Sequence, residues 1–372
     1  MPRAEMITLL GATGYTGRLV ARALDRAGLP YRLAGRSPDK LARLAASLPA
    51  APPWLVADVT RPGTLPALFD GSRVLANCAG PFSDLGEPVV AQAALNGVHY
   101  LDTTNESGYV YRMQSYNALA RRNGAALVPA CAFEVALADC AAALLATGLA
   151  GDGPLAGGGP LDEVAVAYEI RGQGSSLGTR RSAVRALATS WLAYREGQWV
   201  QAIPGREGRR VPLPGGDRPA LSFPSSEIVT VPGHLPVRRV TAWLAVSWHA
   251  LFWAPFLVPV FAWLARGPVG RLTEAAITRL WPPPEGGLRS DAPFAVWVEV
   301  HRGAERRSLT LLGSGVYDVT GEIVAYAAGQ MARPGYDRAG VLAPAAALDP
   351  RALLDEATAR WGLTMQRAED VA

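Results

Sequence analysis

Three glycines at regular spacing near the N-terminus restrict the fold of this chain more than any other feature. They lie in Gly11-Ala-Thr-Gly14-Tyr-Thr-Gly17, between an apolar run at residues 6–10 and residues 16–27, whose apolar side chains recur at helical spacing. In a strand-turn-helix unit, Gly11 permits the tight turn, Gly14 lets a ligand approach the backbone, and Gly17 lets the helix close on the sheet. The loop therefore predicts a pyrophosphate site at a helix N-terminus.

Strands and helices continue to alternate up to about residue 130. Further short apolar runs, each separated from the next by a segment of helical spacing, lie at 31–34, 54–57, 74–77, 99–102 and 126–129. This alternation predicts an α/β fold, in which residues 1–150 form a Rossmann domain with a doubly wound parallel sheet.

The pattern changes after a stretch rich in glycine and proline at residues 150–160. A chain of 372 residues is long enough for two compact domains. Residues 160–335 predict an α+β substrate domain on a mostly antiparallel sheet, and residues 336–372 a helical tail. Within the second domain we expect strands at 163–170, 294–300 and 308–312, extended pieces between 198 and 231, and helices at 176–195 and 321–333.

The end of the second expected strand bears on the choice of cofactor. It reads Ala34-Gly35-Arg36-Ser37 and offers no carboxylate for the ribose 2′-hydroxyl of NAD. Arg36, Ser37 and Lys40 can instead hold a 2′-phosphate, so we expect NADP (as NADPH) rather than NAD. Asp58 could meet the adenine edge, although an aspartate there is as often a turn residue. The expected cofactor-binding residues are Gly11, Ala12, Thr13, Gly14, Tyr15, Thr16, Gly17, Arg36, Ser37, Lys40, Asp58, Asn77, Cys78, Ala79, Gly80 and Pro81.

Composition excludes several other chemistries. Lys40 is the only lysine, and the residue four positions before it is Arg36, so neither a Schiff-base lysine nor a Tyr-x-x-x-Lys relay is expected. Three cysteines without paired spacing and an N-terminus without a signal-peptide pattern indicate a reducing, cytoplasmic location. The four histidines lack metal-ligand spacing, so we expect no metal. No nucleic-acid partner is expected; a homodimer is compatible with the sequence.

Two later segments carry a family resemblance: Asn77-Cys-Ala-Gly80-Pro-Phe, and His99-Tyr-Leu-Asp102-Thr-Thr-Asn-Glu106. With the pieces Phe223-Pro-Ser-Ser226 and Pro232-Gly-His234-Leu-Pro, the chain resembles the saccharopine dehydrogenase-like oxidoreductases over most of its length, and within them most resembles the trans-acting enoyl reductases. That resemblance implies reduction of a double bond in a long lipid or polyketide chain. One departure is Ala132-Phe-Glu134-Val-Ala-Leu-Ala-Asp139, which keeps little of the family's segment at this point.

Polar residues that follow the fifth expected strand are the catalytic candidates. Parallel strands end at one sheet edge, so this loop should lie near the nicotinamide. Asp102, Thr103 and Glu106 are then placed to orient substrate or relay a proton. In the alternative, Asp102 caps the next helix, Glu106 is solvated, and Cys78 is a core residue rather than a nucleophile.

Residues 242–265 form an uncharged apolar block, with Trp243 and Trp263 near its ends. The block is long enough to suggest a membrane span, but Pro255 and Pro259 should break a continuous helix. We therefore expect either a kinked hairpin dipping into the inner face of a membrane or a buried element lining a tunnel for a hydrophobic or lipid substrate. A plain core helix is the alternative without a function. Flanking arginines could attract anionic headgroups; they are Arg238, Arg239, Arg266 and Arg271.

Three functions fit these observations. The first is an NADPH-dependent enoyl reductase acting on a long-chain lipid, isoprenoid or polyketide by hydride transfer. The second is a saccharopine-type amino-acid or imine dehydrogenase, which would need a polar pocket for carboxylates. The third is a non-catalytic NADP sensor or membrane-docking protein, which a Rossmann fold alone would permit.

Overall fold

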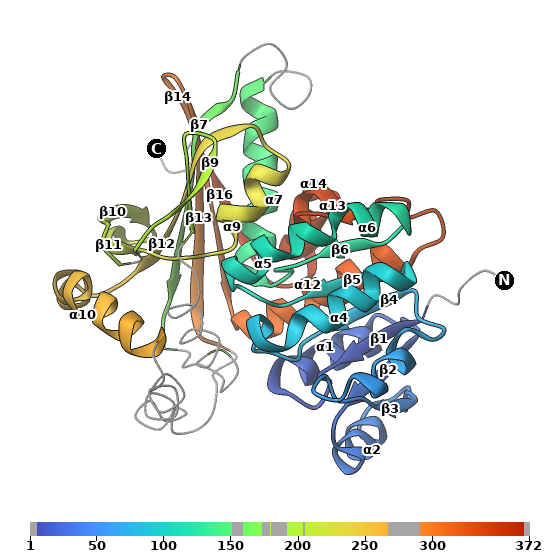
Figure 1. The fold of residues 1–372 in the computed structure, drawn as a ribbon. Coiled ribbons are helices and arrows are strands. Elements are labelled where there is room, and N and C mark those ends of the chain that lie inside the picture. The colour runs from blue at the N-terminus through green and yellow to red at the C-terminus, as the bar shows by residue number, and fades with distance from the viewer. Residues whose placement is uncertain are drawn as a thin grey trace. The chain divides into compact units, whose positions relative to one another are not determined.

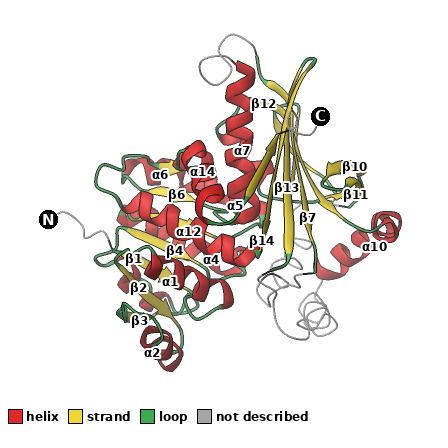
Figure 2. Ribbon diagram, turned by 180° about the vertical axis from the view of Figure 1, so that it is seen from behind, coloured by secondary structure: helices red, strands yellow, loops and turns green. Residues whose placement is uncertain are grey.

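The computed structural model describes residues 6–150, 159–172, 179, 192–203, 205–266 and 291–367. The chain divides into two compact units, each assembled from several segments (Figures 1 and 2). Unit 1 comprises Met1–Thr104, Tyr109–Phe133 and Tyr317–Leu348, and unit 2 comprises Asn105–Gly108, Glu134–Val316 and Asp349–Ala372. The units thus differ from the contiguous ranges that the sequence suggests, chiefly because residues 317–348 return to unit 1.

A seven-stranded sheet forms the centre of unit 1, and every pairing in it is parallel. Across the sheet the strands are β15 (Gly340–Val341), β6 (Ala126–Val128), β5 (His99–Asp102), β4 (Val74–Asn77), β1 (Ile7–Leu10), β2 (Tyr31–Gly35) and β3 (Trp54–Val56). The order runs outward from β1 in one direction and from β4 in the other. The predicted doubly wound Rossmann sheet is confirmed, and its switch point lies between β1 and β4.

The helices of unit 1 connect these strands and cover the sheet. They are α1 (Tyr15–Arg26), α2 (Pro38–Ala46), α3 (Pro66–Phe69), α4 (Phe82–Asn96), α5 (Ser107–Met113), α6 (Asn117–Arg122), α12 (Val316–Ala332) and α13 (Pro344–Ala347), with short 3₁₀ turns at Pro62–Thr64 and Gln114–Tyr116. Two of them, α4 and α6, lie on one face of the sheet (Figure 1). The first two residues of α5 group with unit 2.

Helix α12 packs along α1, although the sequence places its residues in the second domain. A Cβ on Gly321 would lie 3.1 Å from the carbonyl carbon of Leu19, so the absence of a side chain lets the two backbones approach. The rings of Tyr15 and Tyr317 meet edge to face, with centroids 5.1 Å apart. The helical pattern identifies α12, but only packing shows which unit it completes.

Unit 2 is built on a nine-stranded sheet. Its main path is β10 (Gly208–Leu213), β11 (Gly216–Ser222), β12 (Val237–Ala245), β7 (Leu161–Ile170), β13 (Pro293–Arg302), β14 (Glu305–Ser314) and β16 (Thr364–Arg367), while β8 (Leu192–Arg195) pairs with β12 and with β9 (Gln198–Gln201). Among the pairings of the described strands, only that of β12 with β7 is parallel. The predicted mostly antiparallel second sheet is confirmed.

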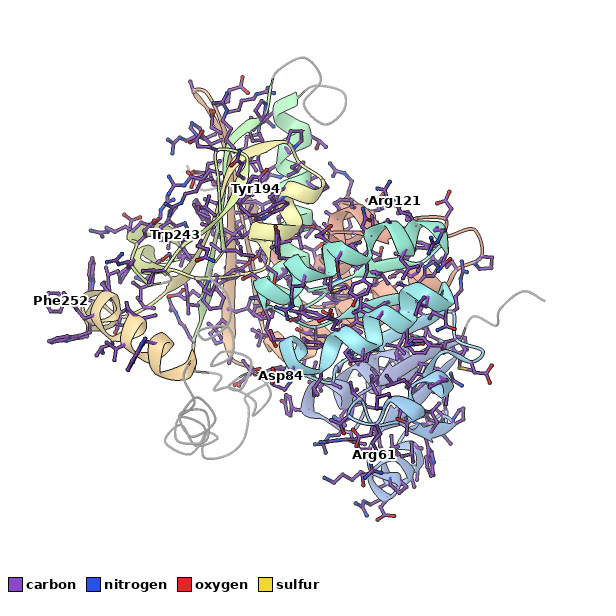
Figure 3. All side chains as sticks on the ribbon, viewed as in Figure 1. Arg61, Asp84, Arg121, Tyr194, Trp243 and Phe252 are labelled. Carbon is purple, nitrogen blue, oxygen red and sulfur yellow. The ribbon has the colours of Figure 1, made fainter. Side chains whose placement is uncertain are left out.

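Side chains of several strands pack into one cluster on this sheet. β10 contacts β13, which is four positions away along the path, so the sheet curls. The guanidinium of Arg209 lies 5.3 Å from the Trp243 ring and 6.0 Å from the Trp297 ring. Figure 3 labels Trp243 within this sheet. The buried cluster comprises Ala165, Ala167, Val211, Leu213, Ala220, Trp243, Ala295 and Trp297.

Four helices complete the described part of unit 2: α7 (Phe133–Ala150), α9 (Glu227–Thr230), α10 (Trp248–Arg266) and α14 (Pro350–Arg360), with a 3₁₀ turn at Val231–Gly233. Helix α7 lies against the sheet, because Arg302 of β13 donates a hydrogen bond to the carbonyl of Leu149. An 18-residue helix at this position was not expected from the sequence.

Several expectations for unit 2 were wrong or lie outside the described residues. The expected linker falls mostly on residues 151–158, which lie outside the described chain. Most of the helix expected at 176–195 also lies outside it, on residues 176–178 and 180–191. The last four residues of the expected helix form β8 instead. The tail contains α13 and α14 but also β15 and β16, so it is not simply helical.

The apolar block also differs from expectation. Residues 242–245 complete β12, and α10 continues through Pro255 and Pro259 rather than breaking there. The exposed aromatic side chains of α10 show that this helix is not buried in a core, whereas a role of the block in lining a substrate tunnel stays a prediction. Among the helices that the structure describes, none has the length and apolar character needed to span a membrane.

Candidate functional site

The register of the parallel sheet brings the ends of four strands to one edge. Leu10 pairs with both Ala34 and Asn77, and Asn77 pairs with Asp102. The loops after β1, β2, β4 and β5 therefore leave the sheet side by side. This edge, at the switch point, is where an open α/β sheet binds its ligand.

Contact between the loops after β1 and β4 requires a glycine at position 11. Gly11 has φ of +78°, and a Cβ there would lie 2.8 Å from the Ala79 nitrogen and from the Cys78 carbonyl carbon. A Cβ on Gly17 would overlap the carbonyl of Gly11. Both glycines are thus required by backbone packing, as the sequence predicts.

Gly14 differs, because it lies at the surface, at the start of α1. A Cβ on Gly14 would lie 3.2 Å from the carbonyl oxygen of Gly11, and Gly14 itself is exposed. It is the N-cap of α1, where no side chain caps the helix and no acidic residue lies in the first turn. The positive end of the α1 dipole is therefore free to attract a phosphate, and the arrangement fits a dinucleotide pyrophosphate.

The remaining loop residues support this turn. Ala12 is buried, and its N–H donates to the carbonyl of Ala34, as does that of Gly11. Thr13 lies beside the end of β2, since its hydroxyl would be 3.8 Å from a Cβ on Gly35. Tyr15 packs on Tyr317, as described above.

Two cations and a hydroxyl follow β2. Arg36 and Lys40 are exposed, and in the described part of the chain Arg36 forms no ion pair. Ser37 is the N-cap of α2, where its hydroxyl accepts a hydrogen bond from the Lys40 N–H at 3.5 Å. No carboxylate lies at the end of β2. This charge arrangement fits a ribose 2′-phosphate rather than a free 2′-hydroxyl.

Asp58 occupies a turn after β3. Its carboxylate accepts hydrogen bonds from the N–H and the hydroxyl of Thr60, at 3.0 and 2.8 Å. These bonds, helped by the nearby charge of Arg36, hold the pKa of Asp58 below its usual value. The structure therefore shows the turn role that the sequence left open, while an adenine contact stays a prediction.

Residues after β4 form a hydrogen-bonded network with β5. Asn77 accepts from the Ala79 N–H at 2.9 Å and donates to the Tyr100 hydroxyl at 3.1 Å. That hydroxyl donates to Asp102 at 2.8 Å and lies 3.1 Å from the Tyr109 hydroxyl. The network fixes the loop from Asn77 to Pro81, whose last peptide bond, Gly80–Pro81, is cis.

Cys78 lies in this loop, near Thr103. Desolvation raises the pKa of the Cys78 thiol to about 12, although a hydrogen bond with the Thr103 side chain opposes the shift. The thiol is therefore protonated at neutral pH and is a poor nucleophile.

The three catalytic candidates fall in different surroundings. Asp102 is fully buried, and its carboxylate accepts from the N–H groups of Thr104 and Ala130, both at 3.0 Å. Burial raises its pKa to about 6 despite these bonds. Thr103 lies in unit 1 beside Cys78, whereas Glu106 is buried in the part of the chain that groups with unit 2. Asp102 therefore holds the loops together, and a catalytic role for any of the three stays a prediction.

Unit 2 contains a carboxyl cluster that the sequence analysis missed. Glu227 is buried and accepts a short hydrogen bond from the Tyr168 hydroxyl, which also contacts the carbonyl of Glu134. Asn105 donates to the Glu134 carboxylate at 3.3 Å and accepts from the Ser226 N–H at 2.8 Å. Four segments distant in sequence thus meet around two carboxyl groups.

Burial makes this cluster able to hold a proton at neutral pH. Desolvation raises the pKa of both Glu134 and Glu227 to about 7, and the charge of Glu227 contributes to the shift of Glu134. In the described chain, the Oε2 atom of Glu227 is buried without a hydrogen-bond partner. A sequence signal existed: Glu134 is the only charged residue in the apolar run Phe133–Ala138, and Glu227 directly precedes the uncharged run Ile228–Val231.

A cleft lies on another part of unit 2, with an empty volume of ≈ 480 Å³ including open solvent. Its described lining is mainly apolar, and the one cation among these residues, Arg195, is paired with Glu207. The lining residues are Leu192, Ala193, Arg195, Ala202, Ile203, Glu207, Ser222, Phe223, Pro224, Ile228, Val240, Thr241, Ala242 and Trp243. Among the described residues, no group of His, Cys, Asp or Glu side chains is arranged to hold a metal.

Comparison with known proteins agrees with this geometry. Residues 7–130 match the family model of the saccharopine dehydrogenase NADP binding domain. The chain is 33% identical over 199 residues to a trans-acting enoyl reductase of Mycobacterium ulcerans, which covers 51% of this chain and 47% of that protein. It is 36% identical over 148 residues to a saccharopine dehydrogenase-like oxidoreductase of Arabidopsis thaliana, covering 36% and 32% respectively. The chain thus spans about half the length, or less, of these relatives.

Among solved structures, apo saccharopine dehydrogenase (L-Glu forming) of Saccharomyces cerevisiae has the same fold, with a TM-score of 0.61 and 13% identity over 98% of this chain and 99% of that one. Fold and site together define a Rossmann-type dinucleotide-binding protein. The resemblance to the saccharopine dehydrogenase-like group is confirmed over residues 7–130, and the NADP of that domain is the cofactor that the end of β2 predicts.

Arg36→Glu tests the 2′-phosphate assignment. A charge-assisted hydrogen bond contributes roughly 1.5–3 kcal/mol, so NADPH should bind about 10- to 100-fold more weakly while NADH changes little. Titration calorimetry with both cofactors measures the difference. Arg43→Glu, at an exposed position in the last turn of α2, is the matched control and should leave both affinities unchanged. Equal losses for NADPH and NADH would show that Arg36 does not read the 2′-phosphate.

Glu227→Gln tests the buried carboxyl cluster through stability. The folded-state pKa of about 7 lies above the ordinary value of 4.5, so the wild-type contribution is complete below pH 4.5 and is lost as pH rises through 7. The shift corresponds to a loss on the order of 3 kcal/mol in the free energy of unfolding. The glutamine variant avoids this loss because its side chain is neutral at every pH. Urea unfolding at acid and alkaline pH should show the variant gaining on wild type as pH rises. Glu305→Gln, exposed on β14, should follow wild type; a pH-independent difference for Glu227→Gln would contradict the raised pKa.

Proposed function

We propose that this chain is an NADPH-dependent reductase of a carbon–carbon double bond in a long apolar substrate. The observation that carries the proposal is the apolar cleft of unit 2, combined with an NADP-binding domain in unit 1. The names of the mycobacterial relatives support the same reaction class.

The cleft argues against the saccharopine-type alternative. An amino-acid or imine dehydrogenase must hold substrate carboxylates, which needs cations with free hydrogen-bond donors. Among the described lining residues, Arg195 is the only cation, and it already pairs with Glu207. Phe223, Ile228 and Trp243 instead offer apolar surface, which suits a hydrocarbon chain.

The residues of unit 1 would bind and orient the cofactor. The open N-terminus of α1 would hold the pyrophosphate, and Arg36 and Lys40 would hold the 2′-phosphate. The loop from Asn77 to Pro81 would border the nicotinamide end. When bound, NADPH supplies a hydride. Asp102 and Thr103 remain our candidates for orienting substrate at this edge of the sheet.

Reduction of a double bond also consumes one proton. Asp102, Glu134 and Glu227 are the described carboxyl groups whose pKa values lie near neutrality. Both oxygens of Asp102 already accept hydrogen bonds, whereas Oε2 of Glu227 has none. We therefore favour the Glu227–Tyr168 pair as the group that holds the proton at pH 7.

A double-label experiment tests the reaction class. Purified protein is incubated in D₂O with a lipid extract and NADPH deuterated at C4, each face in turn, and the products are washed in H₂O before mass spectrometry. Breaking a C=C π bond forms two C–H bonds, so the product should retain one deuterium from NADPH and one from solvent. Reduction of a carbonyl or imine would retain only the first, because deuterium on oxygen or nitrogen exchanges.

Incubations without NADPH and without protein are the controls. Retention of a single label, or labelling of a small amino acid instead of a lipid, would replace the proposal with the saccharopine-type reaction. No label at all, with NADPH binding demonstrated, would favour a non-catalytic NADP-binding protein.

A further inference from the structure

Helix α10 exposes a continuous apolar face. Of its 19 residues, only His249 and the final Arg266 are polar. Seven large apolar side chains of the helix are between 49% and 74% exposed, and Figure 3 shows Phe252 pointing away from the rest of the unit. They are Trp248, Phe252, Trp253, Phe256, Leu257, Val260 and Trp263.

These residues occupy one half of the helix, and the other half holds it to unit 2. At 100° per residue the seven side chains fall within a single half-turn around the axis. On the opposite side, Leu251 packs on Gly208 and Val258 packs on Gly205. A Cβ on Gly208 would lie 2.5 Å from Leu251, and a Cβ on Gly205 would lie 3.2 Å from Val258. Ala254 is buried on this side. The outward face therefore does not contribute to the core of the unit. An exposed apolar patch of this kind marks an interaction surface.

Charge around the helix favours an anionic partner. Residues 205–222, which include the β10–β11 hairpin against α10, contain four arginines and two acidic residues, and α10 itself has no acidic residue. The guanidinium of Arg210 lies 5.7 Å from the Trp248 ring, while it also pairs with Asp217 at 3.5 Å. Tryptophan near both ends of an apolar face, with arginine beside it, is typical of a helix at a membrane interface.

The same charges disfavour a second copy of this chain as the occupant. A two-fold interface would place this net positive hairpin next to itself, and like charges at an interface oppose association. A bilayer with anionic headgroups satisfies both the apolar face and the arginines.

The cleft adjoins this helix. Gly205, which packs on Val258 of α10, lies between the cleft residues Ile203 and Glu207 in the loop before β10. An apolar chain that leaves a bilayer beneath α10 would therefore meet the cleft next. We propose that α10 docks the protein on an anionic bilayer surface and that the substrate is drawn from that bilayer, a step that rests on the proposed reduction of a long apolar substrate.

Vesicle sedimentation with the full chain tests the docking. Wild type should bind vesicles of equal parts phosphatidylcholine and phosphatidylglycerol, and should bind pure phosphatidylcholine vesicles less. Replacing Phe252 and Phe256 by serine together should weaken binding by about tenfold or more, because both side chains would enter the interface. The control replaces Leu95 and Tyr111 by serine, which are exposed in unit 1 and should leave binding unchanged.

Failure of wild type to bind anionic vesicles, or equal binding by the Phe252→Ser/Phe256→Ser variant, would overturn the docking. A dimer in size-exclusion chromatography that this variant converts to monomer, without vesicle binding, would assign the face to a second copy. The double-label reduction, measured in parallel on a detergent-dispersed substrate, separates the two proposals. Reduction without vesicle binding would refute only the docking. Vesicle binding without reduction would refute only the reductase.

Discussion

The approach of two backbone segments at the switch point of the parallel sheet determines much of unit 1. The loop after β1 passes so near the loop after β4 that a Cβ on Gly11 would meet the Cys78–Ala79 peptide at 2.8 Å. This contact orients α1, and Gly17 lets α1 close over the turn. As a result, the uncapped N-terminus of α1 faces outward at Gly14, where a phosphate can approach it.

The two units offer different environments to a ligand. Unit 1 presents exposed cations and free helix dipole, which stabilise phosphate charge in contact with water. Unit 2 presents an apolar cleft and carboxyl groups whose pKa values are raised by desolvation. The reductase that we propose would use both environments, because its hydride and its proton come from different sources.

Local signals in the sequence were sufficient to predict the first six strands of unit 1, the glycine loop and the end of β2, but not β15. Each depends on residues close in the chain, such as Gly11 and Gly17, or Arg36 after its strand. Features that depend on distant contacts were not predictable in this way. Helix α12 joins α1 through Gly321, and the carboxyl cluster joins Asn105, Glu134, Tyr168 and Glu227. The continuity of α10 through Pro255 and Pro259 was also missed, since its contacts with Gly205 and Gly208, made by Val258 and Leu251, come from another segment.

The affinity of the wild-type chain for NADPH relative to NADH, measured by calorimetry at low and high salt, tests the central claim most directly. If the exposed Arg36 and Lys40 hold a 2′-phosphate, NADPH should bind at least roughly tenfold tighter at low salt. The advantage should narrow as salt screens the exposed charges. Equal affinities at low salt, or a preference for NADH, would contradict the account.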